Sequence, residues 1–429
     1  MTIRRFDRSL SWLTRARQVV PGASQTLSKG PGMFVEGAYP VFLDRGQGCR
    51  VWDVDGNEYV DYILGLASIT LGYAYPAVTE AVIRQLERGS IFSLPHPLEV
   101  EVSERLVDLI PCAEMVRFVK TGSEADAAAV RVARAATGRD VIVYCGYMGW
   151  HEWYAITTPR AKGIPKDLSR LVVPFDYNDL GSLERALDAH HGRVAAVIME
   201  PVLLDAPAPG FLHGVKAAAH RHGALLIFDE IVSGFRWAVG GAQERFGVVP
   251  DLATFGKGMA NGLPLAAVVG RAELMREFDD IFVSSTFGGD TLALAACRAT
   301  LETYALMPVI PALWRTGRRF QEGFTALATR LGVPARATGY PVHPKIVIDH
   351  RSPEMERLLM SLFLQETAAR GAMFHFAGFN VSYAHDDTAV DETLEACAGA
   401  LGVVGEALAD GRVAERLRGK PYREAFRRS

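Results

Sequence analysis

The chain has 429 residues, of which 49% are hydrophobic and 22% are charged, a composition typical of a soluble globular protein. Its formal net charge of -3 gives no electrostatic reason to expect a nucleic acid or a membrane surface as a partner. No apolar run approaches the roughly 18 residues that span a bilayer, so we expect no membrane segment. The 5 cysteines are scattered without a CxxC pair, which favours a cytoplasmic protein and argues against a zinc site.

Residues 1–50 predict a helix, the loop PGASQTLSKGPG and an extended segment. Apolar residues recur at helical spacing at the start, which favours an amphipathic helix packed on the protein over a transit peptide. Alternation around the turn Asp55-Gly56-Asn57 then predicts a β-hairpin. Two segments with helical periodicity follow, at residues 76–88 and 97–109.

Short apolar runs alternate with helical segments from Val116 onward, beginning with VRFVK and a helix over residues 123–137. This alternation is the pattern of a parallel β-sheet with helices on its faces, which places the chain in the α/β class. We expect a large α/β domain over residues 60–305. Residues 1–59 and 306–429 predict a smaller α+β domain that is built from both ends of the chain.

One predicted buried strand delivers acids to its carboxyl end. The apolar residues 224–228 precede Asp229 and Glu230, and ligands of open α/β sheets collect at that edge. Further along the chain, Lys257 stands between two glycines that let a planar partner approach its amine. Taken singly, a strand-end aspartate most often caps a helix and a lysine is most often solvated. As a pair, they suit pyridoxal phosphate (PLP), whose aldehyde a lysine holds as a Schiff base while an aspartate keeps the ring nitrogen protonated.

The segment VKTGSEADAAAVR places Gly122 and Ser123 between a strand and an alanine-rich helix. Gly122 permits a tight turn, and we expect Ser123 to cap the helix, so that backbone amides and the helix dipole form an anion site. A cofactor phosphate fits such a site. A plain helix cap is the alternative interpretation.

Three other loops carry candidate residues. Tyr147, in CGYMGWHEW, follows a strand end and offers its ring to a planar cofactor, although aromatic residues in such loops more often fill a core. Glu200, in MEPV, ends another strand, and the loop SSTFGGD supplies hydroxyls and glycines suited to phosphate. His151 and Glu152 lack a spaced third ligand, so we expect no metal site. Nucleotide binding has no motif support, because GxGxxG after a first strand and the P-loop pattern are absent.

Together, TGSEA, the Tyr147 loop, LIFDEIVSGFR, PDLATFGKGMANGLP and STFGGD occur in the order and spacing of the class III, fold-type I, PLP-dependent aminotransferases. The sequence most resembles glutamate-1-semialdehyde aminomutase and its relatives, over nearly the whole chain. This resemblance implies PLP as cofactor, a large domain with a mostly parallel seven-stranded sheet, and a smaller α+β domain.

The resemblance also implies roles for the residues that match the motifs. Lys257 matches the Schiff-base lysine, and Asp229 matches the carboxylate that pairs with the ring nitrogen. Gly122 and Ser123 match the phosphate cup. Tyr147 matches the aromatic residue that stacks on the cofactor ring.

Four further positions follow from the same resemblance. Ile231 resembles the aliphatic residue under the opposite face of the ring, and Glu200 resembles a glutamate on the substrate side. Thr286 resembles the hydroxyl that reaches the cofactor phosphate of a neighbouring subunit, which implies a homodimer with shared sites. Lys29 stands where the aminomutase has an arginine that holds the substrate carboxylate. A lysine lacks that arginine's bidentate fork, so recognition of a carboxylate is weaker on this interpretation.

Other departures from the aminomutase concern its reaction. The counterpart of its gating loop is shorter, at residues 154–170, Thr26 replaces a serine, and its site glutamate falls near Ala377. An internal transfer of the amino group needs a lid that holds the intermediate, so a shorter loop favours release.

We therefore expect an intermolecular transaminase that moves an amino group from a small donor to a ketone or aldehyde by a ping-pong Schiff-base mechanism. The segments QTLSKG, GWHEW and GKGMANG resemble sequences associated with the formation of amino sugars or aminocyclitols. The alternative is a PLP-dependent isomerase, either an aminomutase or an epimerase. An inactive relative used as a binding module is less favoured, because Lys257, Asp229 and Ser123 are intact.

Overall fold

The computed structural model describes residues 4–423. Within the chain, two compact units can be distinguished: one takes in both ends of the chain, up to Tyr75 and from Pro311 onward, and the other is Pro76–Ile310. The chain passes from the first unit to the second at Pro76 and returns to the first after Ile310. The domain limits expected from the sequence, at residues 60 and 305, stay a prediction.

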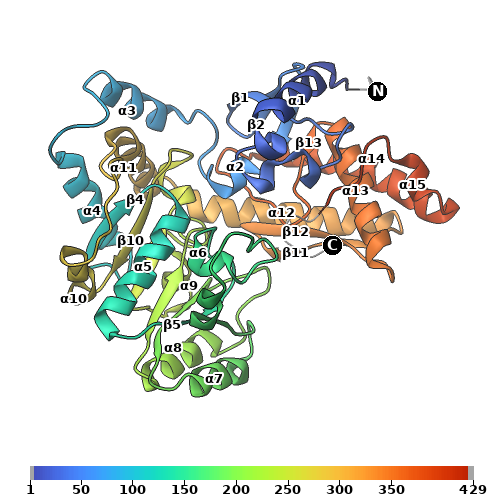
Figure 1. The fold of residues 1–429 in the computed structure, drawn as a ribbon. Helices are drawn as coiled ribbons and strands as arrows, with labels where there is room; N and C mark the ends of the chain where they lie inside the picture. The colour runs from blue at the N-terminus through green and yellow to red at the C-terminus, as the bar shows by residue number, and fades with distance from the viewer. Residues whose placement is uncertain (1–3, 424–429) are drawn as a thin grey trace. The chain divides into compact units, whose positions relative to one another are not determined.

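The unit Pro76–Ile310 is built on a seven-stranded sheet (Figure 1). In spatial order its strands are β4 (Met115–Val119), β10 (Ala266–Gly270), β9 (Leu252–Phe255), β8 (Leu225–Asp229), β7 (Val194–Met199), β5 (Val141–Cys145) and β6 (Val172–Pro174). Strand β10 runs antiparallel to both of its neighbours, and the remaining pairs are parallel. The mostly parallel seven-stranded sheet of the fold-type I class is thereby confirmed.

The central strands are mostly apolar because both of their faces are covered. Every residue of β7 is buried, as is every residue of β9 and β10. Continuous apolar runs of this kind are typical of parallel sheets. The sheet therefore leaves polar side chains to its edges, where the strands end.

Helix α5 (Gly122–Thr137) packs across β7, β9 and β10 with an alanine-rich face (Figure 1). Its N-cap is Thr121, whose hydroxyl accepts a hydrogen bond from the Glu124 N–H, while the Glu124 carboxylate accepts from the Thr121 N–H at 3.1 Å. The expectation that Ser123 caps this helix was wrong. The helix begins one residue before Ser123, and this reciprocal capping box already satisfies the N-cap position.

The other helices of this unit follow the predicted alternation. They are α3 (Pro76–Leu86), α4 (Pro97–Leu109), α6 (Glu152–Ala155), α7 (Leu180–Ala189), α8 (Phe211–Arg221), α9 (Gly241–Phe246), α10 (Ala272–Met275) and α11 (Thr291–Leu306). Helix α11 packs against α3 and α4 (Figure 1). The two helices predicted at residues 76–88 and 97–109 are thus present, as α3 and α4.

The second unit contains two small sheets. One consists of β1 (Leu43–Gln47), β2 (Arg50–Asp53), β3 (Glu58–Asp61) and β13 (Ala372–Met373), and the other of β11 (Ala335–Tyr340) and β12 (His343–Ile348). The predicted hairpin is confirmed, because β2 and β3 pair antiparallel around the turn at residues 54–57. Strand β13 pairs parallel with β3, so this sheet joins the two ends of the chain.

Helices surround these sheets, and aromatic rings fill the core between them. The helices are α1 (Asp7–Val19), α2 (Leu64–Ala67), most of α12 (Val309–Arg330), α13 (Pro353–Ala369), α14 (Asp387–Asp410) and α15 (Val413–Arg416). The ring of Phe374 lies 5.0 Å from that of Tyr62 and 5.1 Å from that of Phe379. Within residues 4–423, none of the helices combines the length and the apolarity that crossing a bilayer requires.

Candidate active site

The carboxyl ends of four neighbouring strands bring the main candidate residues to one edge of the seven-stranded sheet. Strand β8 ends at Asp229, and Glu200 directly follows β7. The loop after β5 carries Tyr147, and Lys257 comes two residues after β9. Because β5, β7, β8 and β9 are mutually parallel, these ends lie together, as expected for a ligand site of an open α/β sheet.

Lys257 occupies a strained stretch of backbone. It begins the 3-10 turn η5 (Lys257–Ala260) with a φ of 41°, in the left-handed region that bulky residues seldom adopt. Strain of this kind persists where the surrounding structure imposes it, and it is concentrated at functional sites. The strained backbone therefore marks Lys257 as a candidate functional residue.

Asp229 is only 5% exposed, and its Oδ1 accepts a hydrogen bond of 2.9 Å from the Ile231 N–H. Burial raises the pKa of Asp229 to about 6, against the opposing effects of the Ile231 N–H and the charge of Lys257. Burial also lowers the pKa of Lys257, although the carboxylates of Asp229 and Glu200 oppose this. The pKa values of the two groups are thus shifted toward each other, as in sites that exchange protons.

Glu200 is tied to the loop that follows β5. Its Oε2 accepts a hydrogen bond of 2.7 Å from the Tyr147 N–H, and burial together with the charge of Asp229 raises the pKa of Glu200 to about 8. Gly146 has a φ of 107°, and a Cβ at that position would lie 2.5 Å from Glu200 Oε2. A glycine is therefore required where the loop passes over the carboxyl group.

Side chains and glycines around Ile231 leave space beside the Asp229 carboxyl. Ile231 is buried, and a Cβ added to Gly122 or to Gly256 would lie 3.1 Å from its Cδ1 atom. Tyr147 is 50% exposed, and its ring makes an edge contact with Tyr154 at 5.8 Å. Half of Tyr147 is thus accessible, while the side chain of Ile231 fills the space that side chains at Gly122 and Gly256 would need.

The N-terminus of α5 forms a second polar feature of this edge. Ser123 lies in the first helical turn, and its Oγ accepts a hydrogen bond of 3.2 Å from the Trp150 N–H. Gly149 has a φ of 81°, and a Cβ there would lie 2.0 Å from Ser123 Oγ. Only glycine lets the loop approach this hydroxyl, and the backbone N–H groups of the first turn favour an anion at the same place.

One residue of this site escaped the sequence analysis. Asp126 of α5 is 1% exposed, and its Oδ1 accepts a hydrogen bond of 2.8 Å from the Thr254 hydroxyl. The signal was present in the sequence, since Asp126 is an acid on the otherwise alanine-rich face of a helix that was expected to pack on the sheet. An acid at such a position is buried and requires a partner.

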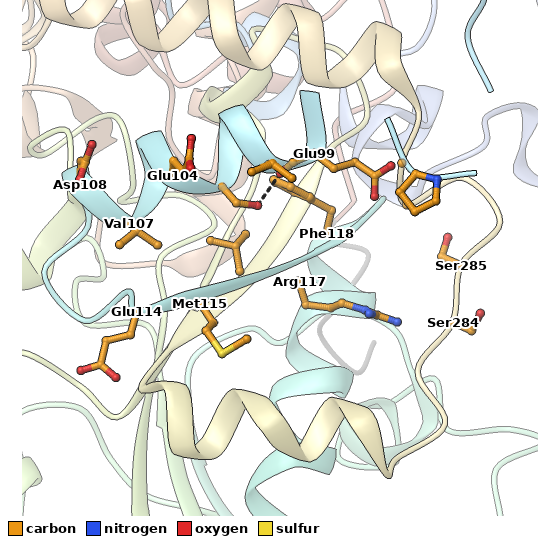
Figure 2. Close-up of a pocket in the computed structure, with 16 residues that line it drawn as sticks. Glu99, Glu104, Val107, Asp108, Glu114, Met115, Arg117, Phe118, Ser284 and Ser285 are labelled. Atoms are coloured by element: carbon orange, nitrogen blue, oxygen red, sulfur yellow. Dashed lines mark hydrogen bonds between the residues drawn. The ribbon is translucent and has the colours of Figure 1, made fainter. Parts of the chain in front are cut away.

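Two other predicted residues belong to other segments of the chain. Thr286 is exposed on the loop before α11, which borders a pocket of about 700 Å³ beside α4 and β4 (Figure 2). Figure 2 shows Ser284 and Ser285 of that loop facing this pocket together with Arg117. Lys29 belongs to the unit that contains both chain ends, where it is exposed and acts on the buried carboxyl of Asp61. The roles given to Thr286 and Lys29 stay predictions.

The carboxyl edge of the sheet matches the chemistry of PLP at separate points. A buried carboxyl and a partly buried amine are available for the ring nitrogen and the aldehyde. The helix N-terminus with Ser123 suits the phosphate, and the spacing glycines keep that cradle open. Within residues 4–423, no group of three histidine, cysteine or acidic residues is arranged to hold a metal ion.

Comparison with known proteins identifies the family. Residues 34–339 match the family model of the class-III aminotransferases. A 3-aminobutyryl-CoA aminotransferase of Cloacimonas acidaminovorans is 38% identical over 94% of this chain and 99% of its own length. A glutamate-1-semialdehyde 2,1-aminomutase of Syntrophobacter fumaroxidans is 34% identical over 92% of this chain and 97% of its own.

A solved structure agrees in both fold and cofactor. The FumI protein of Sphingopyxis sp. MTA144, in its PLP internal aldimine form, superimposes with a TM-score of 0.89 and 28% identity over 97% of this chain and 99% of that one. The sheet, the polar residues at its carboxyl edge and these similarities lead to one conclusion: the chain belongs to the class-III aminotransferases and is a PLP-dependent enzyme.

Proposed function

We propose that the protein is an intermolecular transaminase, which moves an amino group from a small amino donor to a separate ketone or aldehyde. The observation that carries this proposal is the placement of Lys257 and Asp229 at the carboxyl ends of adjacent parallel strands, with Asp229 buried and Lys257 partly buried. An amine of lowered pKa beside a carboxyl of raised pKa is the pair that proton transfer on a bound amine requires.

Each residue of the carboxyl edge has a part in this proposal. Lys257 would hold the cofactor through its aldehyde, and its amine, when free, would accept and return the proton of the bound substrate. Asp229 pairs with the ring nitrogen, and Gly122 and Ser123 bind the phosphate. When bound, the cofactor supplies an electron sink for the negative charge that develops as the substrate loses its proton.

The ring itself lies between two side chains in this proposal. The half-exposed ring of Tyr147 would stack on one side, and Ile231, which Gly122 and Gly256 approach closely, would support the other. Glu200, whose pKa is raised to about 8, then stands on the substrate side as a protonated donor near neutral pH. Its position is fixed by the Tyr147 N–H, so the loop and the acid move together.

The identity of the partners is narrowed by two arguments. Lys29 is a single positive charge, which suits an acceptor with one diffuse anionic group better than a carboxylate clamped in two places. Amino-sugar and aminocyclitol precursors are the acceptor class that the sequence favours. The name of the 38% identical relative adds 3-oxoacyl thioesters as a second class to be tried.

Absorbance spectroscopy of the purified protein tests the cofactor assignment. The wild type is expected to show a visible band from cofactor held covalently by Lys257, and Lys257→Ala should lose both this band and at least about 10⁴-fold in turnover. Lys120, another lysine of the same unit, is paired with Asp290 at 2.9 Å, so Lys120→Ala serves as the matched control that keeps the band. An active Lys257→Ala enzyme that retains the band would refute the assignment.

A half-reaction assay separates the transaminase from the isomerase. Glutamate, glutamine, alanine and amino sugars are offered one at a time, and the keto product is measured after the visible band has disappeared. Stoichiometric release of that product supports intermolecular transfer. An aminomutase is supported instead if the enzyme converts glutamate-1-semialdehyde without releasing any keto product, as the 34% identical relatives named for that activity would lead one to expect.

A homodimer completes the proposal. Large apolar side chains are exposed on the elements around the pocket in Figure 2, which is typical of a surface that meets another protein. They are Leu94, Val100, Met115, Phe282 and Phe287. Light scattering should give twice the 46.8 kDa mass of the chain, and Thr286→Val should weaken PLP binding about tenfold. Ser284→Ala, on the same loop, is the control, and a monomeric active enzyme would exclude the shared site.

A cytoplasmic location is the last part of the proposal. All of the cysteines are free and buried, an arrangement that a reducing compartment maintains. Fractionation of cells that produce the protein, with a cytoplasmic and a secreted marker enzyme, tests the location directly.

A further inference from the structure

A second buried acid lies beside the carboxyl group of Asp229. Asp126 is 1% exposed and faces the sheet from α5, which packs across β9. Its Oδ1 accepts a hydrogen bond of 2.8 Å from the hydroxyl of Thr254, and Thr254 is in register with Asp229 across β9 and β8. Because α5 packs on β9 at this point, the carboxyl of Asp126 lies close enough to that of Asp229 for each to act on the proton affinity of the other. The three side chains therefore form a chain from helix to strand that ends at Asp229.

A hydrogen bond between two carboxyl groups needs a proton, because two carboxylates only accept. Three carboxyl groups, those of Asp126, Asp229 and Glu200, act on one another and on the single amine of Lys257. Like charges this close cannot all ionise, so at least one acid stays protonated near neutral pH.

The surroundings indicate which acid holds this proton. Within the Asp126–Asp229 pair, Asp229 accepts from the Ile231 N–H, a bond that stabilises its anion. Asp126 accepts from a neutral hydroxyl at one oxygen and meets an acid at the other. Burial, followed by the charge of Asp229, raises the pKa of Asp126 well above its ordinary value.

We propose that Asp126 is a positioning residue: its carboxyl group stays protonated and donates to Asp229, which keeps Asp229 ionised and oriented for the cofactor ring nitrogen. Thr254 fixes the direction of this chain, because its hydroxyl donates to Asp126 Oδ1 and leaves the proton on the other oxygen. This inference rests on the proposed pairing of Asp229 with PLP. Neither the family match nor the sequence motifs assign a function to Asp126.

The proton of Asp126 faces a defined set of groups. Asp229 reaches it from β8, Glu200 from the end of β7 and Lys257 from η5, and Thr254 from β9. Tyr147 lies in the field of the same three acids, and burial raises the pKa of its phenol. In the proposed arrangement, Asp126 is the side-chain donor to Asp229. Loss of that donor should therefore raise the pKa of Asp229 and weaken cofactor binding first at the acidic end of the pH range.

Two substitutions, Asp126→Asn and Asp126→Ala, test whether Asp126 acts as a neutral hydrogen-bond donor or as an anion. Asp126→Asn keeps the same shape, one donor for Asp229 and one acceptor for Thr254, so its cofactor affinity should stay within about twofold of wild type at each pH. Asp126→Ala removes the donor, so PLP should bind about tenfold more weakly near neutral pH and its acidic limit should move up by about one pH unit. If Asp126→Asn shifts the pH profile as far as Asp126→Ala does, or if neither variant shifts it, the proposal is overturned.

Thr254→Val provides a second variant should Asp126→Ala fail to fold. It removes the hydroxyl and keeps the volume, and it should shift the pH limit of PLP binding in the same direction by a smaller amount. Thr300 is the matched control, because it is also fully buried and its hydroxyl donates to the Ala296 carbonyl within α11. Thr300→Val should leave the pH profile unchanged, and an equal effect of both threonine variants would overturn the role of Thr254.

Infrared spectroscopy of the cofactor-free protein reads the proton itself. The difference between wild type and Asp126→Asn near neutral pH should contain the C=O stretch of a protonated carboxylic acid, whereas loss of carboxylate bands instead would overturn the proposal. This result does not depend on what the enzyme does. If Asp229→Asn binds PLP like the wild type at every pH, the pairing of Asp229 with the cofactor fails, and that failure is distinguishable because the infrared result for Asp126 stands apart from it.

Discussion

Asp229 and Asp251 are two aspartates of nearly equal burial that flank adjacent strands at opposite edges of the same sheet. They are 5% and 4% exposed, and Asp229 ends β8 whereas Asp251 directly precedes β9. Burial raises the pKa of Asp229 to about 6. Burial also raises the pKa of Asp251, but the Leu226 N–H, His220 and Arg271 outweigh it, and the net shift is downward.

The difference shows that burial does not decide which acid is functional. Asp251 Oδ2 accepts bonds of 2.8 Å from the Leu226 N–H and from His220, and Oδ1 accepts a bond of 2.9 Å from Arg271. These partners belong to the fold, so Asp251 has nothing left to offer a ligand. Asp229 is compensated only in part, and in the proposed function a cationic cofactor ring would supply the remaining positive charge. A buried acid whose hydrogen-bond and charge partners do not offset the cost of burial is therefore a candidate for a functional site.

Exchange of Asp229 for asparagine tests the functional half of the comparison and has the largest expected effect. The amide keeps the shape of the side chain but cannot hold a positive charge on the ring nitrogen, so turnover should fall about 10³-fold. Steady-state rates at saturating PLP give the value, and a folded, dimeric variant shows that the loss is chemical. A decrease of less than tenfold would place Asp229 with Asp251 among the structural acids.

Exchange of Asp251 for alanine tests the structural half. The change leaves the Leu226 N–H buried without its acceptor and removes the partner of Arg271, so the free energy of unfolding should fall by about 3 kcal/mol. Urea unfolding of the cofactor-free protein measures this loss. Turnover per folded molecule should stay within about twofold of wild type, and a large loss of turnover without loss of stability would reverse the assignment of the two acids.

The two acids should also give stability opposite dependences on pH. Asp229 has a folded-state pKa of about 6, above its ordinary value of 3.8, so the folded cofactor-free protein binds the extra proton and gains stability as the pH falls from above 6 toward 4. The pKa of Asp251 is lowered, so its contribution is present above the ordinary value of 3.8 and is lost as the pH falls through its lower folded value.

Asp229→Asn should therefore stabilise the cofactor-free protein at mildly alkaline pH, by on the order of 2 kcal/mol, while it abolishes most activity. Thermal unfolding across the pH range measures the slope between pH 4 and 6, which should flatten in this variant. A variant that is less stable than wild type at alkaline pH would mean that the fold already compensates Asp229 as fully as Asp251.

The sequence predicted the elements of the sheet well because its signals are local. Runs of buried apolar residues mark β5, β7 and β8, and the limits predicted for one helix, residues 97–109, are those of α4. The cap of α5 was assigned wrongly, since Thr121 and Ser123 are both good capping residues and only the backbone decides between them.

The candidate site was predictable where a single chain segment carries the signal. Lys257 and Asp229 stand in recognisable stretches at strand ends, and the fold brings those ends together. Asp126 was missed because its meaning arises from a contact with Thr254, which is far away along the chain. Asp251 was equally invisible, since the partners that make it structural come from α8 and from the residue after β10.

Replacement of His220 tests how much one of the three donors to Asp251 contributes to stability, and it has the smallest expected effect. It shares Oδ2 of Asp251 with the buried Leu226 N–H, and its side chain is 41% exposed, so water can replace its bond. His220→Ala should therefore cost only about 1 kcal/mol in the free energy of unfolding and leave turnover unchanged. Arg271→Ala is the matched control, because that side chain is 46% exposed and holds the other oxygen. If His220→Ala lowers the free energy of unfolding as much as Asp251→Ala does, His220 alone accounts for the stabilisation of the Asp251 carboxylate. The contrast with Asp229 would then depend on one donor and not on the full set of three.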